Sequence, residues 1–188
     1  MKVIETSLDG LLVIEPDVFN DNRGFFFESF KLNRYKASGV PDDFVQDNIS
    51  RSVKNTLRGL HYQVGTMAQG KLCQVPYGAV YDVVVDIRFG SPTFGKFNAV
   101  ELSDKNKLQL WIPPGFAHGF AVLSDEAVFH YKCTNYYDKS SERTLLYNDP
   151  ALNIDWKITE PVVSEKDKSG ILLKDIEKDF EYGKIKKD

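Results

Sequence analysis

The sequence predicts an all-β fold, in which many short strands form a jelly roll with short peripheral helices. Short segments of alternating polar and apolar residues follow one another along most of the 188 residues. This period of two is typical of half-buried strands. No long helical pattern separates the segments, and strands at such short spacing are typical of antiparallel sandwiches and barrels.

Turn-forming residues mark the ends of the predicted strands. Asparagine, aspartate, serine, glycine and proline gather at 20–22, 77–78, 91–92, 113–115 and 124–125, where they favour tight turns. The β-branched and aromatic residues between these points favour strands. We predict strands over 11–14, 25–30, 45–52, 56–62, 71–77, 79–88, 96–102, 107–112, 119–122, 127–137 and 143–147.

Two short helices are predicted, over 31–38 and 171–180. Ser164 precedes an acidic residue, Asp167, at the third helical position, which is a loose capping box. A helical extension is therefore expected from about residue 164. The length suits a single domain over 1–188, with neither an internal repeat nor a linker.

Composition narrows the class of protein. Hydrophobic residues make up 42% of the chain and aromatic residues 13%, which indicates a packed globular body. A net charge of −3 disfavours a nucleic-acid partner.

The N-terminus has no apolar signal-peptide core and no apolar run approaches bilayer length, so we expect a cytoplasmic protein without a membrane partner. Cys73 and Cys133 have no metal-type spacing and are expected to be small buried hydrophobes.

Three residues with catalytic potential, Arg58, His61 and Lys71, lie on two consecutive predicted strands. Histidine can take a proton near neutral pH, lysine can stabilise an anion, and arginine can bind phosphate. A separation of three residues puts Arg58 and His61 on opposite faces of a regular strand. A bulge at Gly59 could bring them to one face. In the plainer alternative, Arg58 only pairs with an acidic neighbour.

The histidines do not match a metal site. Metal-binding jelly rolls of the cupin type use two imidazoles one residue apart, a nearby glutamate, and a third imidazole after a Pro-x-Gly turn. His118 follows such a turn, but His61 is followed by Tyr62 and Gln63 instead of a second histidine. Two imidazoles without a clear acidic partner make a poor site. The chain therefore resembles a cupin-like barrel whose cavity has lost its metal.

Tyr131 and Tyr137 fall on one face of the predicted strand 127–137. If this face looks into the barrel, both line its cavity, about 20 Å apart at roughly 3.3 Å per residue. Either tyrosine could equally be a core aromatic residue. Glu28 lies in the aromatic segment 25–30, where it either faces water at an edge or has a specific hydrogen-bond partner.

Six segments together resemble the dTDP-4-dehydrorhamnose 3,5-epimerase family, enzymes of dTDP-L-rhamnose synthesis. They are FNDNRGFFFES at 19–29, FVQDN at 44–48, LRGLHYQ at 57–63, SPTFG at 91–95, PGFAHGF at 114–120 and YKCTNYY at 131–137. Their order and spacing make the resemblance specific, and it extends from about residue 10 to residue 170. The resemblance implies a metal-free cupin-like jelly roll that works as a homodimer without a cofactor. It also implies a dTDP-4-keto-6-deoxy sugar as substrate, dTDP-4-dehydro-6-deoxy-D-glucose, inverted at C3 and C5.

The resemblance also implies roles for individual residues. His61 matches the family's general base and Tyr131 its general acid, while Asp167 matches the aspartate that orients the histidine. Lys71 matches the lysine near the developing enolate, and Tyr137 the residue that stacks on thymine. Further substrate contacts are implied at Arg23, Glu28, Gln46, Asn48, Arg58, His118, Glu142 and Lys166.

Three other functions remain open at this point. A mono-epimerase, which inverts only C3 or C5 of a related sugar, would use the same base and acid. A non-catalytic nucleotide-sugar binding module would not need His61, Lys71 and Tyr131 together. A metal-dependent cupin oxygenase is disfavoured by the missing ligands.

Overall fold

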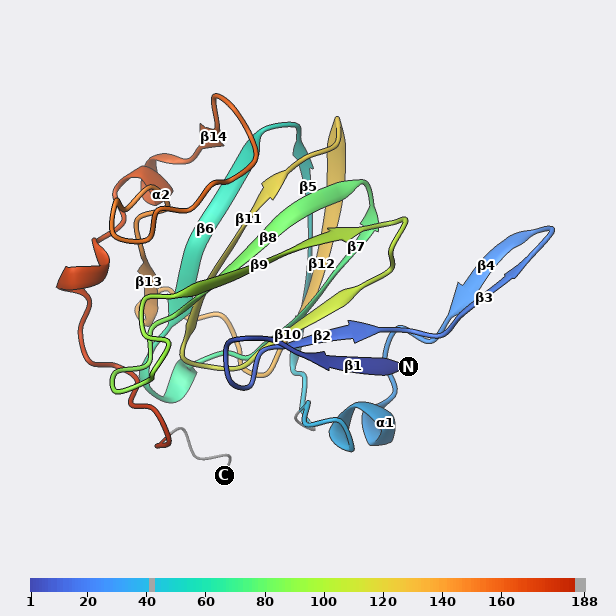
Figure 1. Ribbon diagram of the computed structural model, residues 1–188, viewed down its shortest axis with the longest axis horizontal. Helices are drawn as coiled ribbons and strands as arrows, with labels where there is room; N and C mark the ends of the chain where they lie inside the picture. The colour runs from blue at the N-terminus through green and yellow to red at the C-terminus, as the bar shows by residue number, and fades with distance from the viewer. Residues whose placement is uncertain (41–42, 185–188) are drawn as a thin grey trace.

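The computed structural model describes residues 1–40 and 43–184, and most of its strands belong to two facing sheets (Figure 1). The prediction of an all-β fold with short peripheral helices is confirmed. The strands are β1 Lys2–Glu5, β2 Leu12–Glu15, β3 Val18–Asp21, β4 Gly24–Phe27, β5 Gln46–Val53, β6 Thr56–Gln63, β7 Lys71–Tyr77, β8 Ala79–Asp86, β9 Phe97–Ser103, β10 Gln109–Ile112, β11 Phe116–Val122, β12 Glu126–Cys133, β13 Glu142–Thr144 and β14 Val162–Val163. The helices are α1 Leu32–Lys36 and α2 Glu165–Lys168, with 3₁₀ turns η1 Gly65–Met67 and η2 Leu173–Asp175.

The strand order is that of a jelly roll, in which strands far apart in the sequence become neighbours. The first sheet has the order β1-β2-β10-β7-β12-β5, and the second has the order β13-β6-β11-β8-β9 with β14 beside β6. All strand pairs are antiparallel except β14 with β6. An antiparallel sheet allows alternate residues to face the barrel interior, which is where a binding cavity can form.

The main core fills the space between the two sheets. Its side chains include Leu110 and Phe129 from the first sheet and Val84, Phe116 and Phe120 from the second. Phe120 and Phe129 stack across the barrel with ring centroids 4.2 Å apart. Aromatic contacts of this kind add to the free energy gained by burying apolar surface.

Both sheets are also covered on part of their outer faces, which explains the nearly continuous apolar sequence of β8. The C-terminal segment packs Trp156, Ile176 and Phe180 against the outer face of the second sheet. On the outer face of the first sheet, Tyr35 of α1 packs with Trp111. A strand that is buried on both faces lacks the alternation of a half-buried strand.

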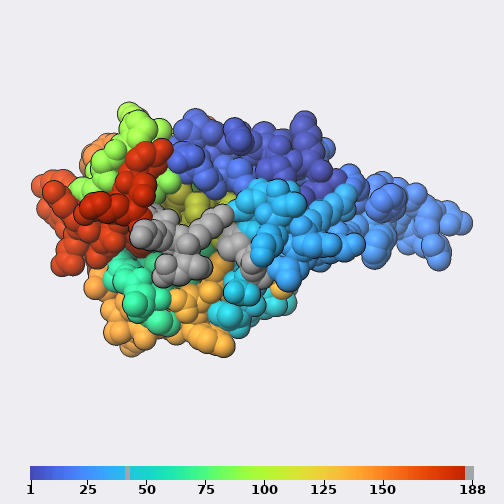
Figure 2. Space-filling view, turned by 90° about the horizontal axis from the view of Figure 1, so that it is seen from below, coloured from blue at the N-terminus to red at the C-terminus, as the bar shows by residue number. Residues whose placement is uncertain are grey.

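A separate hairpin, formed by β3 and β4, projects away from the barrel in both views (Figures 1 and 2). Its turn carries Arg23, which pairs with Asp21 at 2.6 Å. Phe19 and Phe26 are 65% and 68% exposed on it. Large apolar side chains gathered on a projecting element are typical of an interaction surface.

Several predicted boundaries are wrong. The short strands β1, β3 and β14 were not predicted, and β12 ends at Cys133 instead of continuing to residue 137. The predicted helix over 171–180 is only the 3₁₀ turn η2, because this segment runs extended against the barrel. Leu145 bridges to Ile171 and Phe89 to Glu181, and this tertiary pairing overrides a weak local helical preference.

Other local predictions are confirmed. Helix α1 lies within the predicted range 31–38, and Ser164 caps α2, with its Oγ accepting a hydrogen bond from the Asp167 amide at 3.2 Å. Cys73 and Cys133 are buried free thiols. No helix among the described residues is long and apolar enough to cross a membrane.

Candidate active site

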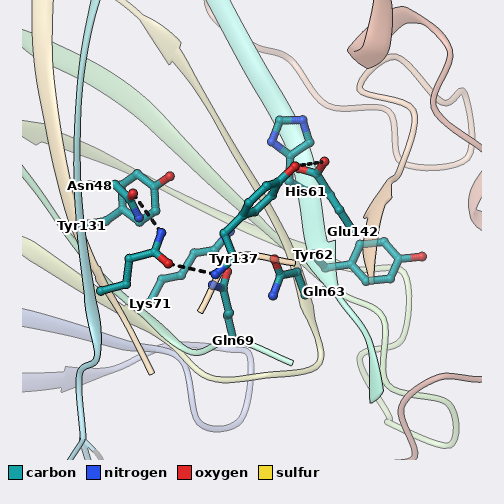
Figure 3. Close-up of a pocket in the computed structure, with 10 residues that line it drawn as sticks. Asn48, His61, Tyr62, Gln63, Gln69, Lys71, Tyr131, Tyr137 and Glu142 are labelled. Atoms are coloured by element: carbon teal, nitrogen blue, oxygen red, sulfur yellow. Dashed lines mark hydrogen bonds between the residues drawn. The ribbon is translucent and has the colours of Figure 1, made fainter. Parts of the chain in front are cut away.

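A cavity of about 220 Å³ opens between the two sheets at one end of the barrel (Figure 3). Strands β5, β7 and β12 of the first sheet and β6 and β13 of the second contribute side chains to it. Seven of the residues that sequence analysis singled out line it: Gln46, Asn48, His61, Lys71, Tyr131, Tyr137 and Glu142.

A bulge in β6 determines which side chains point into the cavity. On the neighbouring strand β11, His118 is opposite His61 and Phe120 is opposite Arg58. An advance of two residues along β11 therefore corresponds to three residues along β6. Arg58 and His61 therefore share the interior face, as the predicted bulge at Gly59 requires. Gly59 has φ +129°, and a Cβ there would lie 2.4 Å from the Cα of Gly119. Only glycine fits this close approach of two backbones.

His61 is paired with Asp167, which lies 106 residues further along the chain. Its Nε2 lies 2.6 Å from Oδ1 of Asp167, and the other carboxylate oxygen accepts a hydrogen bond from the Gly59 amide at 3.3 Å. An ionised carboxylate only accepts hydrogen bonds, so Nε2 donates and Nδ1 keeps the basic lone pair.

Asp167 itself is 3% exposed. Burial raises the pKa of its carboxyl, but the hydrogen bond and charge of His61 and the bonds from Gly59 and Ser164 outweigh burial. The net pKa is therefore lowered, and the carboxylate is ionised at neutral pH. A negative charge held next to an imidazole is suited to stabilise an imidazolium.

Tyr131 faces His61 from the opposite sheet, on β12 (Figure 3). Burial, reinforced by the neighbouring Cys133 and Cys73, raises the pKa of its hydroxyl to about 12. The hydroxyl therefore carries its proton at neutral pH. Lys71, on the adjacent strand β7, places its Nζ 6.0 Å from the centre of the Tyr131 ring. An imidazole, a phenol hydroxyl and a lysine amine thus surround one cavity.

Tyr137 stands at the cavity mouth, in the loop after β12 (Figure 3). Its amide donates to Oε1 of Gln46 at 2.8 Å, and its hydroxyl donates to Glu142 at 3.1 Å. Lys166 also pairs with Glu142, at 2.8 Å. Tyr131 and Tyr137 do line the same cavity, but β12 ends between them at Cys133, so the prediction that one strand carries both residues is wrong.

A second imidazole–carboxylate pair joins β11 to β8, where His118 lies opposite His61. Nε2 of His118 lies 2.9 and 3.1 Å from the two carboxylate oxygens of Asp82. Burial raises the pKa of Asp82 and lowers the pKa of His118, and the attraction between the two partly offsets both shifts. Sequence analysis missed Asp82, although a carboxylate within the apolar segment 79–88 is itself a signal of a buried polar pair.

The remaining predicted site residues divide into two groups. Arg58 donates from Nε to the buried Ser52 hydroxyl at 3.1 Å, and no described carboxylate forms an ion pair with it. The plainer reading of Arg58 as the partner of an acidic residue therefore finds no support in the described part of the chain.

Arg23 and Glu28 lie at the projecting hairpin, and Glu28 pairs with Arg34 at 3.4 Å. The structure does not bring these two residues to the cavity of their own chain.

The donor atoms around the cavity do not suit a metal ion. Within residues 1–40 and 43–184, no three histidine, cysteine or acidic side chains gather as ligands. The Nε2 atoms of His61 and His118 both face carboxylates of their own, and Lys71 brings a positive charge to the same cavity. Each of these Nε2 atoms is therefore already engaged by a carboxylate.

Comparison with known proteins identifies the family of this chain. Residues 5–175 match the family model of dTDP-4-dehydrorhamnose 3,5-epimerase. The chain belongs to this family. It is therefore an isomerase, and its β-barrel is the cupin-like jelly roll of these epimerases.

Individual relatives agree with the family assignment. The dTDP-4-dehydrorhamnose 3,5-epimerase of Shigella flexneri is 54% identical over 171 residues, which cover 90% of this chain and 94% of the relative. A 3,5-epimerase from Legionella pneumophila, solved in complex with dTDP-4-keto-L-rhamnose, is 53% identical with a TM-score of 0.92. That match covers 96% of this chain and 98% of the other. A 3'-monoepimerase from Streptomyces bikiniensis, solved with dTDP-quinovose, is less similar, at 32% identity and a TM-score of 0.86 over 90% of this chain and 86% of the other.

Proposed function

We propose that this epimerase converts dTDP-4-dehydro-6-deoxy-D-glucose to dTDP-4-dehydro-L-rhamnose by inverting C3 and C5 without a metal or cofactor. The observation that carries the proposal is the placement of His61 and Tyr131 on opposite sheets, across one cavity. A base on one face of a sugar ring and an acid on the other can invert a carbon centre. The L. pneumophila relative, solved with dTDP-4-keto-L-rhamnose, supports the choice of sugar.

The chemistry follows from the C4 ketone of the substrate. C3 and C5 both flank this ketone, so Nδ1 of His61 can remove either hydrogen to give an enolate. Lys71 offsets the charge that develops at O4, and Asp167 holds the imidazolium. Tyr131 then donates its proton to the opposite face of the same carbon. Solvent exchange returns both groups to their starting states, and the cycle repeats at the second carbon.

Binding of the nucleotide positions the sugar for these steps. We assign the thymine platform to Tyr137 and further substrate contacts to Gln46, Asn48, Arg58, His118, Glu142 and Lys166. General acid–base catalysis contributes roughly 10²–10⁴-fold, so positioning must supply much of the remaining rate. The family's part in dTDP-sugar synthesis supports a cytoplasmic location.

Deuterium incorporation tests this function directly. We expect that incubation with dTDP-4-dehydro-6-deoxy-D-glucose in D₂O, in chelator-treated buffer, places deuterium at both C3 and C5 in an NMR spectrum. Deuterium at only one carbon would identify a mono-epimerase, and binding without any exchange would identify a binding module. Loss of activity on chelation, restored by one divalent ion, would contradict the metal-free mechanism.

We further propose that the protein works as a homodimer in which each hairpin completes the partner's cavity. The hairpin β3–β4 projects from the barrel and exposes Phe19 and Phe26, whose burial in a second copy would be favourable. Arg23 and Glu28 match substrate-contacting positions of the family, yet Arg23 lies in the turn of this hairpin and Glu28 directly follows its second strand. A second copy of the chain would bring both within reach of a substrate.

Complementation between two inactive variants tests this arrangement. One variant carries Arg23→Ala with Glu28→Gln, and the other carries His61→Ala. If hairpins serve the partner, mixed dimers contain one complete site and should recover up to about half of the activity per mixed dimer. Each variant alone serves as the control. If mixing restores nothing while mixed dimers form, the hairpin acts on its own chain or not at all.

A further inference from the structure

The platform residue Tyr137 lies in a loop without regular structure of its own. Tyr136 and Tyr137 are 61% and 53% exposed, and the segment 134–141 follows the end of β12. A loop of this kind needs tertiary contacts to hold one conformation. The contacts that fix it therefore decide how well Tyr137 can stack on a base.

Gln63 supplies such contacts from the end of β6, and it is only 5% exposed. Its Nε2 donates to the carbonyl oxygens of Met67 at 2.7 Å and Tyr136 at 3.1 Å. Its Oε1 accepts a hydrogen bond from the Asp138 amide at 2.9 Å. The side chain thus binds the backbone on both sides of Tyr137 and ties it to the neighbouring turn η1.

These bonds use both N–H groups of the Gln63 side-chain amide and one lone pair of its oxygen. Although Gln63 lines the cavity, it has no donor left for a ligand. The buried amide would leave unpaired backbone groups if it turned away, which is unfavourable. Its position suits a role that acts through Tyr137, and not a role as a direct ligand.

We propose that Gln63 is a positioning residue that holds the loop 134–141 so that Tyr137 can bind the nucleoside. This inference rests on the proposed function, since it assigns the support of the nucleotide end of that same site. The residues at the sugar end, His61, Lys71 and Tyr131, lie on the strands β6, β7 and β12. Loosening the loop should therefore weaken nucleotide binding and leave proton transfer in place.

The substitution Gln63→Met keeps the approximate shape and removes all of these bonds. Its affinity for dTDP, measured by calorimetry, should fall roughly tenfold, the size expected when a base loses its stacking partner. KM should rise by a similar factor with kcat little changed. Gln63→Glu, a smaller change, keeps the acceptor for Asp138 but loses both donors, and we expect it to behave in the same direction.

A matched control is Asn106→Leu, because Asn106 makes similar side-chain bonds to the backbone of the turn between β9 and β10. Its Oδ1 accepts from the amides of Ser103 and Leu108, and its Nδ2 donates to Glu101. Asn106 does not line the cavity. This variant should lose stability while its dTDP affinity stays unchanged, which separates a general loss of stability from a loss of positioning.

Unchanged dTDP affinity in folded Gln63 variants, or a fall in kcat with KM unchanged, would overturn the proposal. A measurement on the unaltered protein applies even if the variants fail to fold. The Asp138 amide should exchange slowly with D₂O because it donates a hydrogen bond to Gln63, and fast exchange there would also overturn the proposal. Failure of the proposed function is distinguishable, because the unaltered protein would then incorporate no deuterium at C3 or C5.

Discussion

Replacing His61 with alanine should abolish deuterium exchange at both C3 and C5 while dTDP still binds. The imidazole is the proposed base for both carbons, and its removal should cost roughly 10²–10⁴-fold in rate. Nucleotide binding should survive, because Tyr137 lies in the loop after β12 and is held by Gln46 of β5 and Glu142 of β13, none of which depends on the imidazole. Single-turnover exchange followed by NMR, together with a dTDP titration, measures both effects.

Asp167→Asn tests whether the pair acts as one unit. Asparagine can still fill the space, but it cannot hold an imidazolium by charge, so exchange should fall on the order of 10²-fold or more. Adding Asp167→Asn to His61→Ala should cost little more, since residues that act as a unit are non-additive. If the two losses multiply instead, the residues work independently.

A plainer role for Asp167 makes different predictions. Asp167 is also the third residue of α2, where its amide is capped by Ser164. If it only supports this helix, Asp167→Asn should keep near-normal activity and lose at most about 1 kcal/mol of stability.

The lowered pKa of Asp167 also predicts how stability changes with pH. Because the folded pKa lies below the unfolded value, its contribution is present above the unfolded pKa of about 3.9 and is lost as pH falls through the folded pKa. The Asp167→Asn variant should lack this part of the pH dependence of the free energy of unfolding.

The two tyrosines should separate the sugar end of the site from the nucleotide end. Tyr131→Phe removes only the hydroxyl that is proposed to return a proton, so exchange should fall by about 10²-fold or more with dTDP affinity nearly intact. Tyr137→Ala removes the stacking platform, and base stacking contributes about 1–3 kcal/mol. Its main effect should be weaker dTDP binding.

Titration of dTDP against both tyrosine variants provides the comparison. Equal loss of affinity in the two would mean that the cavity is not divided into a sugar end and a nucleotide end. The assignment of acid and platform would then be wrong. Gln63→Met should resemble Tyr137→Ala in this titration, whereas His61→Ala should resemble Tyr131→Phe.

Much of the fold and the chemistry was readable from local sequence. Alternating apolar residues and turn residues predicted most strands, and the capping box at Ser164 marked the start of α2. The residue types at 58, 61 and 71 indicated proton abstraction from a charged substrate. The glycine at 59 allowed a bulge, without which a spacing of three residues cannot bring Arg58 and His61 to one face of a strand.

The prediction failed where long-range contacts outweigh weak local preferences. The segment 171–180 runs extended because Ile176 and Phe180 pack on the second sheet. Tyr137 left its predicted strand because the loop after Cys133 is tied to Gln63 and Gln46. In both cases, burial and hydrogen bonds to residues far away in sequence contribute more than the preference of a short segment.

The sequence by itself determined the strand pattern, the family motifs and the kinds of chemical group available. Only the tertiary structure decided that Asp167 meets His61 across 106 residues, that Asp82 pairs with His118, and that Arg23 lies on a hairpin away from its own cavity. Propensity and periodicity act over a few neighbouring residues, whereas these pairings depend on the register of strands that come together only when the two sheets close around the core.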